Sequence, residues 1–378
     1  MLQWKSILLP FFVVILCLII IEGVARMVIY PKQSMPNISI IPHPVLNHTW
    51  NPHVSGISIA RGRPYRLYAN KQGWVEHDDV SVKKSPSTYR IFFVGDSNVE
   101  GVVNTNNKME DLVDKELNER FKGRGINFEV INTGTKSYST VIYYLLIKTE
   151  LLKYAPDLIV INMDMTDVPD DFYYRPLTRF DADGHPTAVL PEDTMIKKEY
   201  VLTPFGRLKL SWIDKIDLKL SEWSAFYRWV ASQLVKETNP SLRYMDRSAN
   251  WLSLTWDQQI QDNVNYSMGI LELIMELLKE QGVKFYITGV PHFPQYTGKY
   301  STKPLQVLKE TVELKGGLYL DSFAAMEPYI KNSRQADYYW AGDPGHFNES
   351  GNALWAAVHL KFLTYPENKL LPQELTDH

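Results

Sequence analysis

Residues 89–101 read YRIFFVGDSNVEG, and this stretch decides the fold. Its first six residues are aromatic, β-branched or otherwise strand-forming, which predicts a short buried strand over residues 89–94. Gly95 then lets the chain turn sharply, so Ser97 is expected at the start of the next helix. Free N–H groups at a helix start can stabilise a developing negative charge. A serine here is either a helix N-cap or a nucleophile, and this stretch alone leaves both open.

Strand and helix patterns alternate on either side of this stretch. Further strands are predicted at residues 128–132, 157–162, 283–290 and 318–321, and helices at residues 108–121, 139–152, 258–281, 303–314 and 353–363. Such alternation is typical of a parallel sheet covered by helices on both faces, which places the chain in the α/β class.

The N-terminus carries a long apolar run. Residues 7–21 are apolar apart from Pro10 and Cys17, and residues 1–27 together are long enough to cross a hydrocarbon core of about 30 Å. A cleaved signal peptide is the alternative, but residues 22–25 match a cleavage site poorly. We therefore expect an uncleaved transmembrane helix, with its short N-terminal tail in the cytoplasm and the catalytic domain outside it, either in a periplasm or at the cell surface.

Four further regions follow the expected anchor. Residues 28–88 are proline-rich and predict an extended arm with short strands. Residues 89–365 form the α/β domain, which is interrupted at about residues 171–255 by an insertion rich in Tyr, Trp, Lys and Asp. A hairpin turn is predicted within that insertion at Asp183 and Gly184. Residues 366–378 form a tail.

Composition excludes several classes of function. The formal net charge of -3 and the scattered basic residues give no field that would recruit nucleic acid. The single cysteine, Cys17, permits neither an intrachain disulfide nor a cysteine-based metal site. P-loop, dinucleotide-binding and zinc-protease patterns do not occur, so no cofactor and no metal are predicted. The expected partners are an ester substrate and, through the N-terminal helix, a lipid bilayer.

Two further motifs are expected at the same edge of the sheet as Ser97, because ligands of open α/β sheets bind at the carboxyl ends of the strands. Asp343 lies three residues before His346 across a Pro-Gly turn, so the carboxylate can orient an imidazole that acts as the base for a serine. Gly134 follows the strand at 128–132, where its backbone N–H is a candidate oxyanion donor; losing one such donor costs about 3 kcal/mol. Each motif alone also occurs in ordinary turns.

The order and spacing of these motifs resemble the SGNH/GDSL hydrolase superfamily over roughly residues 89–365. The block from Gly95 to Gly101 matches its Gly-Asp-Ser-x-x-x-Gly opening, Gly134 matches its second-block glycine, and Asp343 with His346 matches its last block. The N-terminal helix and arm resemble a membrane-anchored branch associated with bacterial envelope polysaccharides.

The resemblance implies a flavodoxin-like three-layer α/β/α sandwich with a five-stranded parallel sheet in the order 2-1-3-4-5. It also implies a triad of Ser97, His346 and Asp343, and oxyanion donors from the backbones of Ser97 and Gly134.

The third block departs from the family pattern Gly-x-Asn-Asp. Thr166 stands where that pattern has the oxyanion asparagine, and Asp164 replaces its glycine. A threonine hydroxyl reaches less far than an amide, and a carboxylate opposes a neighbouring oxyanion. Asn162 could take the donor role only if its strand ended early. Asn98, Asp164 and His292 are further candidates for binding substrate.

Three functions remain open at this point. The first is a serine esterase that removes acyl groups, usually acetyl, from an exported glycan. The second is an O-acyltransferase that passes the same group to a polysaccharide hydroxyl and differs mainly in excluding water. The third is a catalytically degenerate domain that binds a glycan or a protein partner, which the altered third block favours.

Overall fold

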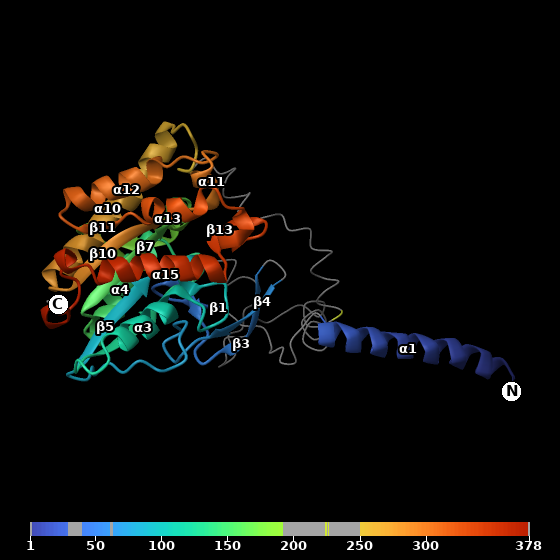
Figure 1. Cartoon of the computed structure of the whole chain (residues 1–378). Coiled ribbons are helices and arrows are strands. Elements are labelled where there is room, and N and C mark those ends of the chain that lie inside the picture. The colour runs from blue at the N-terminus through green and yellow to red at the C-terminus, as the bar shows by residue number, and fades with distance from the viewer. Residues whose placement is uncertain are drawn as a thin grey trace.

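The protein is described by a computed structural model that covers residues 2–28, 40–60, 63–191, 224, 226 and 250–376. Its centre is a five-stranded parallel sheet with the spatial order β6-β5-β7-β10-β11 (Figure 1). The strands are β5 (Thr88–Val94), β6 (Asn127–Asn132), β7 (Leu158–Asp164), β10 (Lys284–Val290) and β11 (Leu318–Leu320). Numbered along the chain, these strands follow the order 2-1-3-4-5, which confirms the predicted topology.

The neighbouring inner strands β5 and β7 are buried along their entire length. A parallel strand covered on both faces needs apolar side chains at successive positions, which explains why both strands are mostly apolar and do not alternate between polar and apolar residues. Phe92 and Val94 of β5 pack on one face of the sheet, while Ile91 and Phe93 pack on the other.

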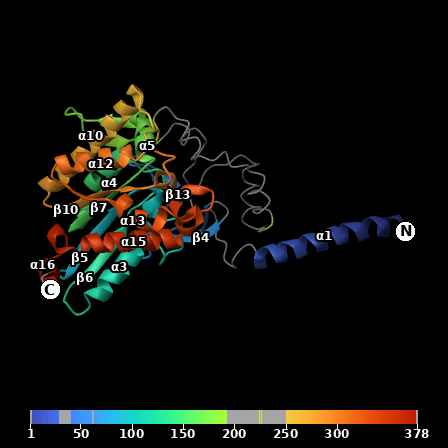
Figure 2. The ribbon, with the colours of Figure 1, turned by 45° about the horizontal axis from the view of Figure 1, so that its top comes forward.

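Helices cover both faces of the sheet and make three layers (Figure 2). One face carries α4 (Thr140–Thr149), α5 (Asp167–Tyr174), α10 (Gln258–Glu280) and α12 (Lys303–Leu314), and the other carries α3 (Met109–Arg120), α13 (Ser322–Ile330) and α15 (Glu349–Leu363). Helices α5 and α13 were not predicted from the sequence. The predicted helix at 353–363 begins earlier, at Glu349, because Asn348 caps it by accepting the Gly351 amide at 3.0 Å.

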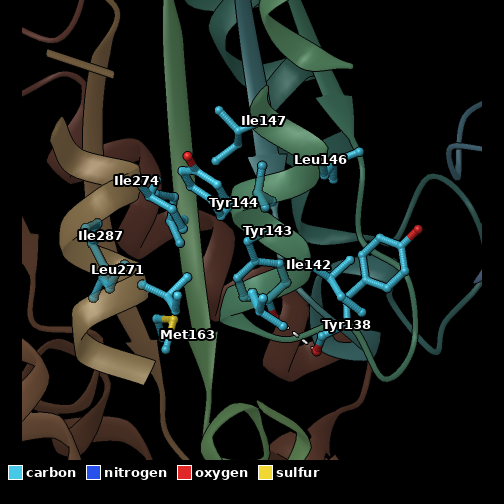
Figure 3. Packing of buried hydrophobic residues seen from close by; sticks show 14 of the residues in the cluster. Tyr138, Ile142, Tyr143, Tyr144, Leu146, Ile147, Met163, Leu271, Ile274 and Ile287 are labelled. Atoms are coloured by element: carbon cyan, nitrogen blue, oxygen red, sulfur yellow. Dashed lines mark hydrogen bonds between the residues drawn. The ribbon is translucent and has the colours of Figure 1, made fainter. Parts of the chain in front are cut away.

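Helix α4 is enclosed on all sides. Figure 3 shows its side chains beside Met163 of β7 and beside Leu271 and Ile274 of α10. Every residue from Thr140 to Ile147 is buried, so this helix is apolar around its whole circumference. The adjacent helical turn η1 (Leu151–Tyr154) continues the same layer.

The segment before the sheet forms two hairpins, β1 (Ile40–His43) with β2 (Asn47–Trp50), and β3 (Ser55–Ala60) with β4 (Arg63–Tyr68). The predicted short strands are therefore present, and the segment also contacts the α/β domain. Tyr138 donates a hydrogen bond to the His48 carbonyl at 2.7 Å, and the Trp50 indole donates to Glu100 at 3.1 Å. Residues 29–39 and 61–62 of the expected arm lie outside the described residues.

Helix α1 (Leu2–Val28) covers the apolar run at the N-terminus and extends away from the α/β domain in both views (Figures 1 and 2). Across the described ranges, no helix combines the length and apolar character needed to cross a membrane.

The described part of the insertion contains the predicted hairpin, formed by β8 (Thr178–Phe180) and β9 (Pro186–Val189). Gly184 in its turn has a φ of 82°, a left-handed conformation that glycine adopts without steric cost. The remainder of the expected insertion, residues 192–249 apart from 224 and 226, lies outside the described residues. The helical turn η2 (Arg175–Leu177) precedes the β8–β9 hairpin. The tail holds two short helical turns, η3 (Pro366–Asn368) and α16 (Gln373–Thr376).

Candidate active site

The candidate nucleophile lies directly after β5, the strand between β6 and β7 in the sheet. The chain turns at Gly95, and the short helix α2 (Ser97–Glu100) begins at Ser97 itself. Asp96 is its N-cap, because one oxygen of its carboxylate accepts the Asn98 amide at 2.8 Å. The sequence therefore places Ser97 in the first helical turn, at the carboxyl edge of the sheet.

The candidate base reaches Ser97 from a hairpin near the end of the chain. Residues 343–347 were expected to be a turn, but they form strand β13 (Asp343–Phe347), paired with β12 (Tyr339–Trp340). Tyr339 and Phe347 are opposite each other in this pair, and both are buried. They pack in the same cluster as α3, α13 and α15, which fixes the hairpin against that face of the domain.

The structure brings Ser97, His346 and Asp343 together in one chain of contacts. Ser97 Oγ lies 2.8 Å from His346 Nε2, and His346 Nδ1 lies 2.9 Å from Asp343 Oδ2. With its Nδ1 proton donated to the carboxylate, the neutral imidazole presents an unprotonated Nε2 to the serine hydroxyl. The side chain of Asp343 is only 6% exposed, whereas that of His346 is 27% exposed and open to a substrate. This arrangement can remove the proton from Ser97 when its oxygen attacks.

Carboxylates govern the charge state of this histidine. Burial lowers the pKa of His346, but the hydrogen bond to Asp343 and the charges of Asp343, Asp96 and Asp164 outweigh it and raise the pKa to about 9. The imidazole is therefore mostly protonated at neutral pH, and the form that can act as a base becomes populated as the pH rises.

Asp96 is a second acceptor for the serine, and sequence analysis did not single it out. Its Oδ2 lies 3.2 Å from Ser97 Oγ. Burial and the charge of Asp164 raise the pKa of Asp96 to about 7. When His346 is protonated and both of its nitrogens donate, the Ser97 hydroxyl can donate to Asp96 instead. The N-cap position directly before the serine was the only sequence signal for this contact.

Asp164 joins the other candidate side chains into one buried network. Its Oδ2 accepts from Asn98 Nδ2 at 2.8 Å and lies 3.1 Å from His292 Nε2, and its Oδ1 accepts both the amide and the hydroxyl of Thr166 at 2.8 Å. Burial favours the neutral acid, but the contacts with His292 and Thr166 prevail and lower the pKa of Asp164. Asp164 is thus a fully bonded carboxylate, where the family pattern has a glycine.

Two of the three predicted oxyanion donors make other bonds in this structure. The Thr166 hydroxyl donates to Asp164, and the Gly134 amide donates to Asn132 Oδ1 at 2.9 Å. The Ser97 amide, by contrast, has no hydrogen-bond acceptor in the described part of the chain. Asn162 is fully buried within the sheet and donates to the Val94 carbonyl at 3.2 Å.

Two glycines of the motifs lie in close packing, and one of them is required there. A Cβ on Gly134 would lie 2.2 Å from the Glu100 nitrogen, so the loop after β6 can approach α2 only as glycine. A Cβ on Gly345 would lie 3.0 Å from His292 Cε1, so the His292 ring packs directly against β13 between Asp343 and His346. Among the described residues, no cluster of His, Cys, Asp and Glu side chains is arranged to hold a metal ion.

No known family model matches the chain, and no curated protein sequence matches it either. Similar solved structures include Axe2, an acetylxylan esterase from Geobacillus stearothermophilus, with a TM-score of 0.40, 14% identity, and coverage of 72% of this chain and 93% of that one. LAE5, an alpha/beta hydrolase enzyme from the metagenome of Lake Arreo in Spain, has a TM-score of 0.39 and 13% identity, with coverage of 74% and 95%. At these TM-scores and identities, the likeness says nothing about what this chain does.

Proposed function

We propose that the protein is a serine esterase of the SGNH/GDSL type that removes acyl groups, usually acetyl, from an exported glycan. The observation that carries the proposal is the contact chain from Ser97 Oγ to His346 Nε2 at 2.8 Å and from His346 Nδ1 to Asp343 at 2.9 Å. These are the distances at which a base and its orienting carboxylate can activate a serine.

The reaction proceeds in two halves. Ser97 Oγ attacks the ester carbonyl while its proton moves to His346 Nε2. The tetrahedral intermediate collapses as His346 returns that proton to the leaving sugar oxygen, which leaves an acyl group on Ser97. A water molecule then attacks the acyl group with His346 again as the base, and the carboxylic acid departs as Ser97 regains its proton. Asp343 holds the imidazole in orientation throughout.

The oxyanion of each intermediate is stabilised by the Ser97 amide at the start of α2. The Gly134 amide contributes a second hydrogen bond only when it gives up Asn132 Oδ1, its acceptor at 2.9 Å. A site with a single preorganised donor forgoes about 3 kcal/mol of transition-state stabilisation relative to a site with one more. We therefore expect slower catalysis than in an esterase with three free donors.

Hydrolysis of p-nitrophenyl acetate by the full-length chain tests the proposal. Ser97→Ala is expected to lower kcat/KM by about a thousandfold or more. Ser87→Ala is the matched control, because Ser87 is exposed and lies before β5, and its activity is expected to equal that of the wild type. Equal turnover by the wild type and Ser97→Ala contradicts the proposed esterase.

The Thr166 hydroxyl and the Gly134 amide already donate to other side chains and are not free to stabilise an oxyanion. This favours one alternative, a non-catalytic domain that binds a glycan or a protein partner. Such a domain is expected to bind oligosaccharide without turning over any ester.

Transfer of the acyl group to a polysaccharide hydroxyl uses the same triad as hydrolysis. Product analysis with an added oligosaccharide separates the two reactions, because transfer yields acylated saccharide and hydrolysis yields free acid.

The substrate class and location rest on the sequence resemblance to the membrane-anchored branch and on the apolar run covered by α1. We propose a single-pass arrangement with a cytoplasmic N-terminus and an extracytoplasmic catalytic domain. Alkaline extraction of membranes tests the anchor, and protease digestion of intact cells or spheroplasts tests the orientation. Release of the full-length chain by alkaline extraction contradicts the anchor.

A further inference from the structure

Asp164, the last residue of β7, is a buried carboxylate at the carboxyl edge of the sheet. It is 1% exposed, and both of its oxygens accept hydrogen bonds. Its contacts reach three other parts of the fold: Asn98 of α2 at 2.8 Å, His292 after β10 at 3.1 Å, and Thr166 before α5 at 2.8 Å. At this exposure Asp164 acts on its protein neighbours and not on a bound substrate.

On the nucleophile side, Asp164 holds the residue that follows Ser97. The Asn98 side chain donates to Asp164 Oδ2, and the Asn98 backbone amide donates to Asp96 Oδ1 at 2.8 Å. Asn98 is itself 5% exposed. Two buried carboxylates therefore fix the first turn of α2, and with it the place of Ser97 Oγ.

On the base side, the segment after β10 supports the hairpin that carries His346. The His292 ring lies against Gly345, the residue directly before His346, since an added Cβ there would lie 3.0 Å from His292 Cε1 and 3.2 Å from its Nε2. The neighbouring Pro291 carbonyl accepts the Tyr339 hydroxyl of β12 at 2.7 Å. The end of β10 thus contacts both strands of this hairpin.

Asp164 also places a negative charge among other titratable groups. Burial favours its neutral acid, but the contacts with His292 and Thr166 prevail and lower the pKa of Asp164. Its charge is one of those that, against the effect of burial, raise the pKa of His346. The titratable groups that face Asp164 from the surrounding elements are Asp96 after β5, Tyr143 of α4, Asp167 of α5, His292 after β10, Tyr339 of β12 and His346 of β13.

Burial, together with the charges of Asp96 and Asp164, raises the pKa of Asp167 well above its usual range, so Asp167 stays neutral. The same surroundings leave Asp164 ionised because it has hydrogen-bond donors on both oxygens. A buried charge is costly unless such partners compensate it. Here the compensated charge lies where it can act on the catalytic histidine.

We propose that Asp164 and His292 are positioning residues, which hold Ser97 and His346 in contact, and that the Asp164 charge stabilises the imidazolium of His346. That imidazolium forms when the Ser97 proton moves to His346 Nε2. The inference rests on the proposed esterase function for its kinetic consequences, whereas the effect of Asp164 on the His346 ring does not need turnover.

Asp164→Asn tests the charge, because it removes the charge and keeps the size of the side chain. Asn98 Oδ1 is buried without a hydrogen-bond partner among the described residues, and a rotated Asn98 amide can accept the added N–H, so we expect this variant to fold. NMR titration of the His346 ring, identified by its absence in His346→Gln, is expected to give a lower pKa in Asp164→Asn than in the wild type.

Steady-state hydrolysis of p-nitrophenyl acetate by the full-length protein tests the positioning. At about pH 10 the His346 ring is mostly neutral in both proteins, so a difference in kcat reports geometry and charge stabilisation and not the fraction of free base. Asp164→Asn is expected to lower kcat there about tenfold or more and to leave KM within about twofold. A residue that binds substrate would instead raise KM and leave kcat largely unchanged.

His292→Met and His292→Gln test the link to the base-bearing hairpin. Both have about the length of histidine, but only glutamine keeps an N–H donor for Asp164. His292→Met is expected to lower kcat about tenfold, and His292→Gln is expected to recover most of this loss. His77→Met is the matched control, because His77 is exposed outside this network, and its kcat is expected to equal that of the wild type.

Thermal unfolding confirms that each variant is folded, and the His292 pair decides the question if Asp164→Asn is not. An unchanged pKa of the His346 ring in folded Asp164→Asn overturns the proposal. So does a folded His292→Met with wild-type kcat, or a His292→Gln no more active than His292→Met. If the wild type hydrolyses no ester, the esterase function fails, and the NMR titration still decides whether Asp164 acts on His346.

Discussion

The raised pKa of His346 makes the pH dependence of the reaction a direct test of the site. Asp343 accepts the His346 Nδ1–H at 2.9 Å, and together with the charges of Asp96 and Asp164 it raises the pKa of His346 to about 9. With that pKa, about one imidazole in a hundred is neutral at pH 7. Because only the neutral imidazole can accept the serine proton, kcat/KM is expected to rise about tenfold per pH unit up to about pH 8 and to level off above about pH 9.

The assay is p-nitrophenyl acetate hydrolysis from about pH 6 to about pH 10, with the rate of Ser97→Ala subtracted at each pH to remove hydrolysis by hydroxide. Titration of the His346 ring by NMR gives the pKa without turnover. The reasoning is refuted if kcat/KM has already levelled off by about pH 7 and the NMR titration of the His346 ring is complete by then. Both results would place the pKa of His346 near its ordinary value of 6.5.

The raised pKa of His346 also makes the free energy of unfolding depend on pH. A histidine whose pKa is raised from 6.5 to about 9 on folding stabilises the protein below pH 6.5, and this contribution is lost as the pH rises through about 9. The loss is about 3 kcal/mol, at about 1.4 kcal/mol for each pH unit of the shift. The difference in unfolding free energy between the wild type and His346→Gln is therefore expected to shrink over this window. A difference that is constant with pH contradicts the raised pKa of His346 in the folded protein.

Three substitutions test the roles of individual residues. Thr166→Val is expected to lower kcat less than tenfold, because its hydroxyl already donates to a neighbouring carboxylate; a loss of about a hundredfold or more in steady-state kinetics identifies it as an oxyanion donor after all. Gly134→Ala places a Cβ 2.2 Å from the Glu100 nitrogen, so we expect about 1–3 kcal/mol of destabilisation in urea unfolding, and an unchanged midpoint argues against the close approach. Leu271→Ala in α10 removes a fully buried side chain and is expected to cost about 2–5 kcal/mol, whereas Leu314→Ala at an 85% exposed position is expected to cost almost nothing; similar losses contradict the packing.

Local sequence signals predicted the fold well where one element depends on its own residues. The helix α12 has its predicted bounds, since Pro304 sits in its first turn and Gly316 follows its end in a left-handed conformation. Strand β5 and the turn at Gly95 were predicted because a continuous apolar run followed by glycine has few other structures. The sheet order came from the resemblance to a known superfamily and not from these local signals.

The contacts within the site were harder to predict, because they join residues far apart in the chain. Asn98, Asp164 and His292 were each candidates, but their convergence on one carboxylate depends on the adjacency of β5, β7 and β10 in the sheet. Strand β13 was missed because its partner β12 is only two residues long. Gly134 was expected to present an amide to substrate, and only the folded chain shows the close contact with α2 that requires glycine there.

Reaction of Ser97 with a fluorophosphonate probe tests the central claim most directly, because only an activated serine attacks such a reagent at a useful rate. Mass spectrometry of the digested full-length protein is expected to find one adduct, on the peptide that contains Ser97. His346→Gln is expected to suppress the labelling while the protein remains folded. Absence of an adduct on Ser97 in folded wild-type protein, or equal labelling of His346→Gln, contradicts the proposed activation of this serine.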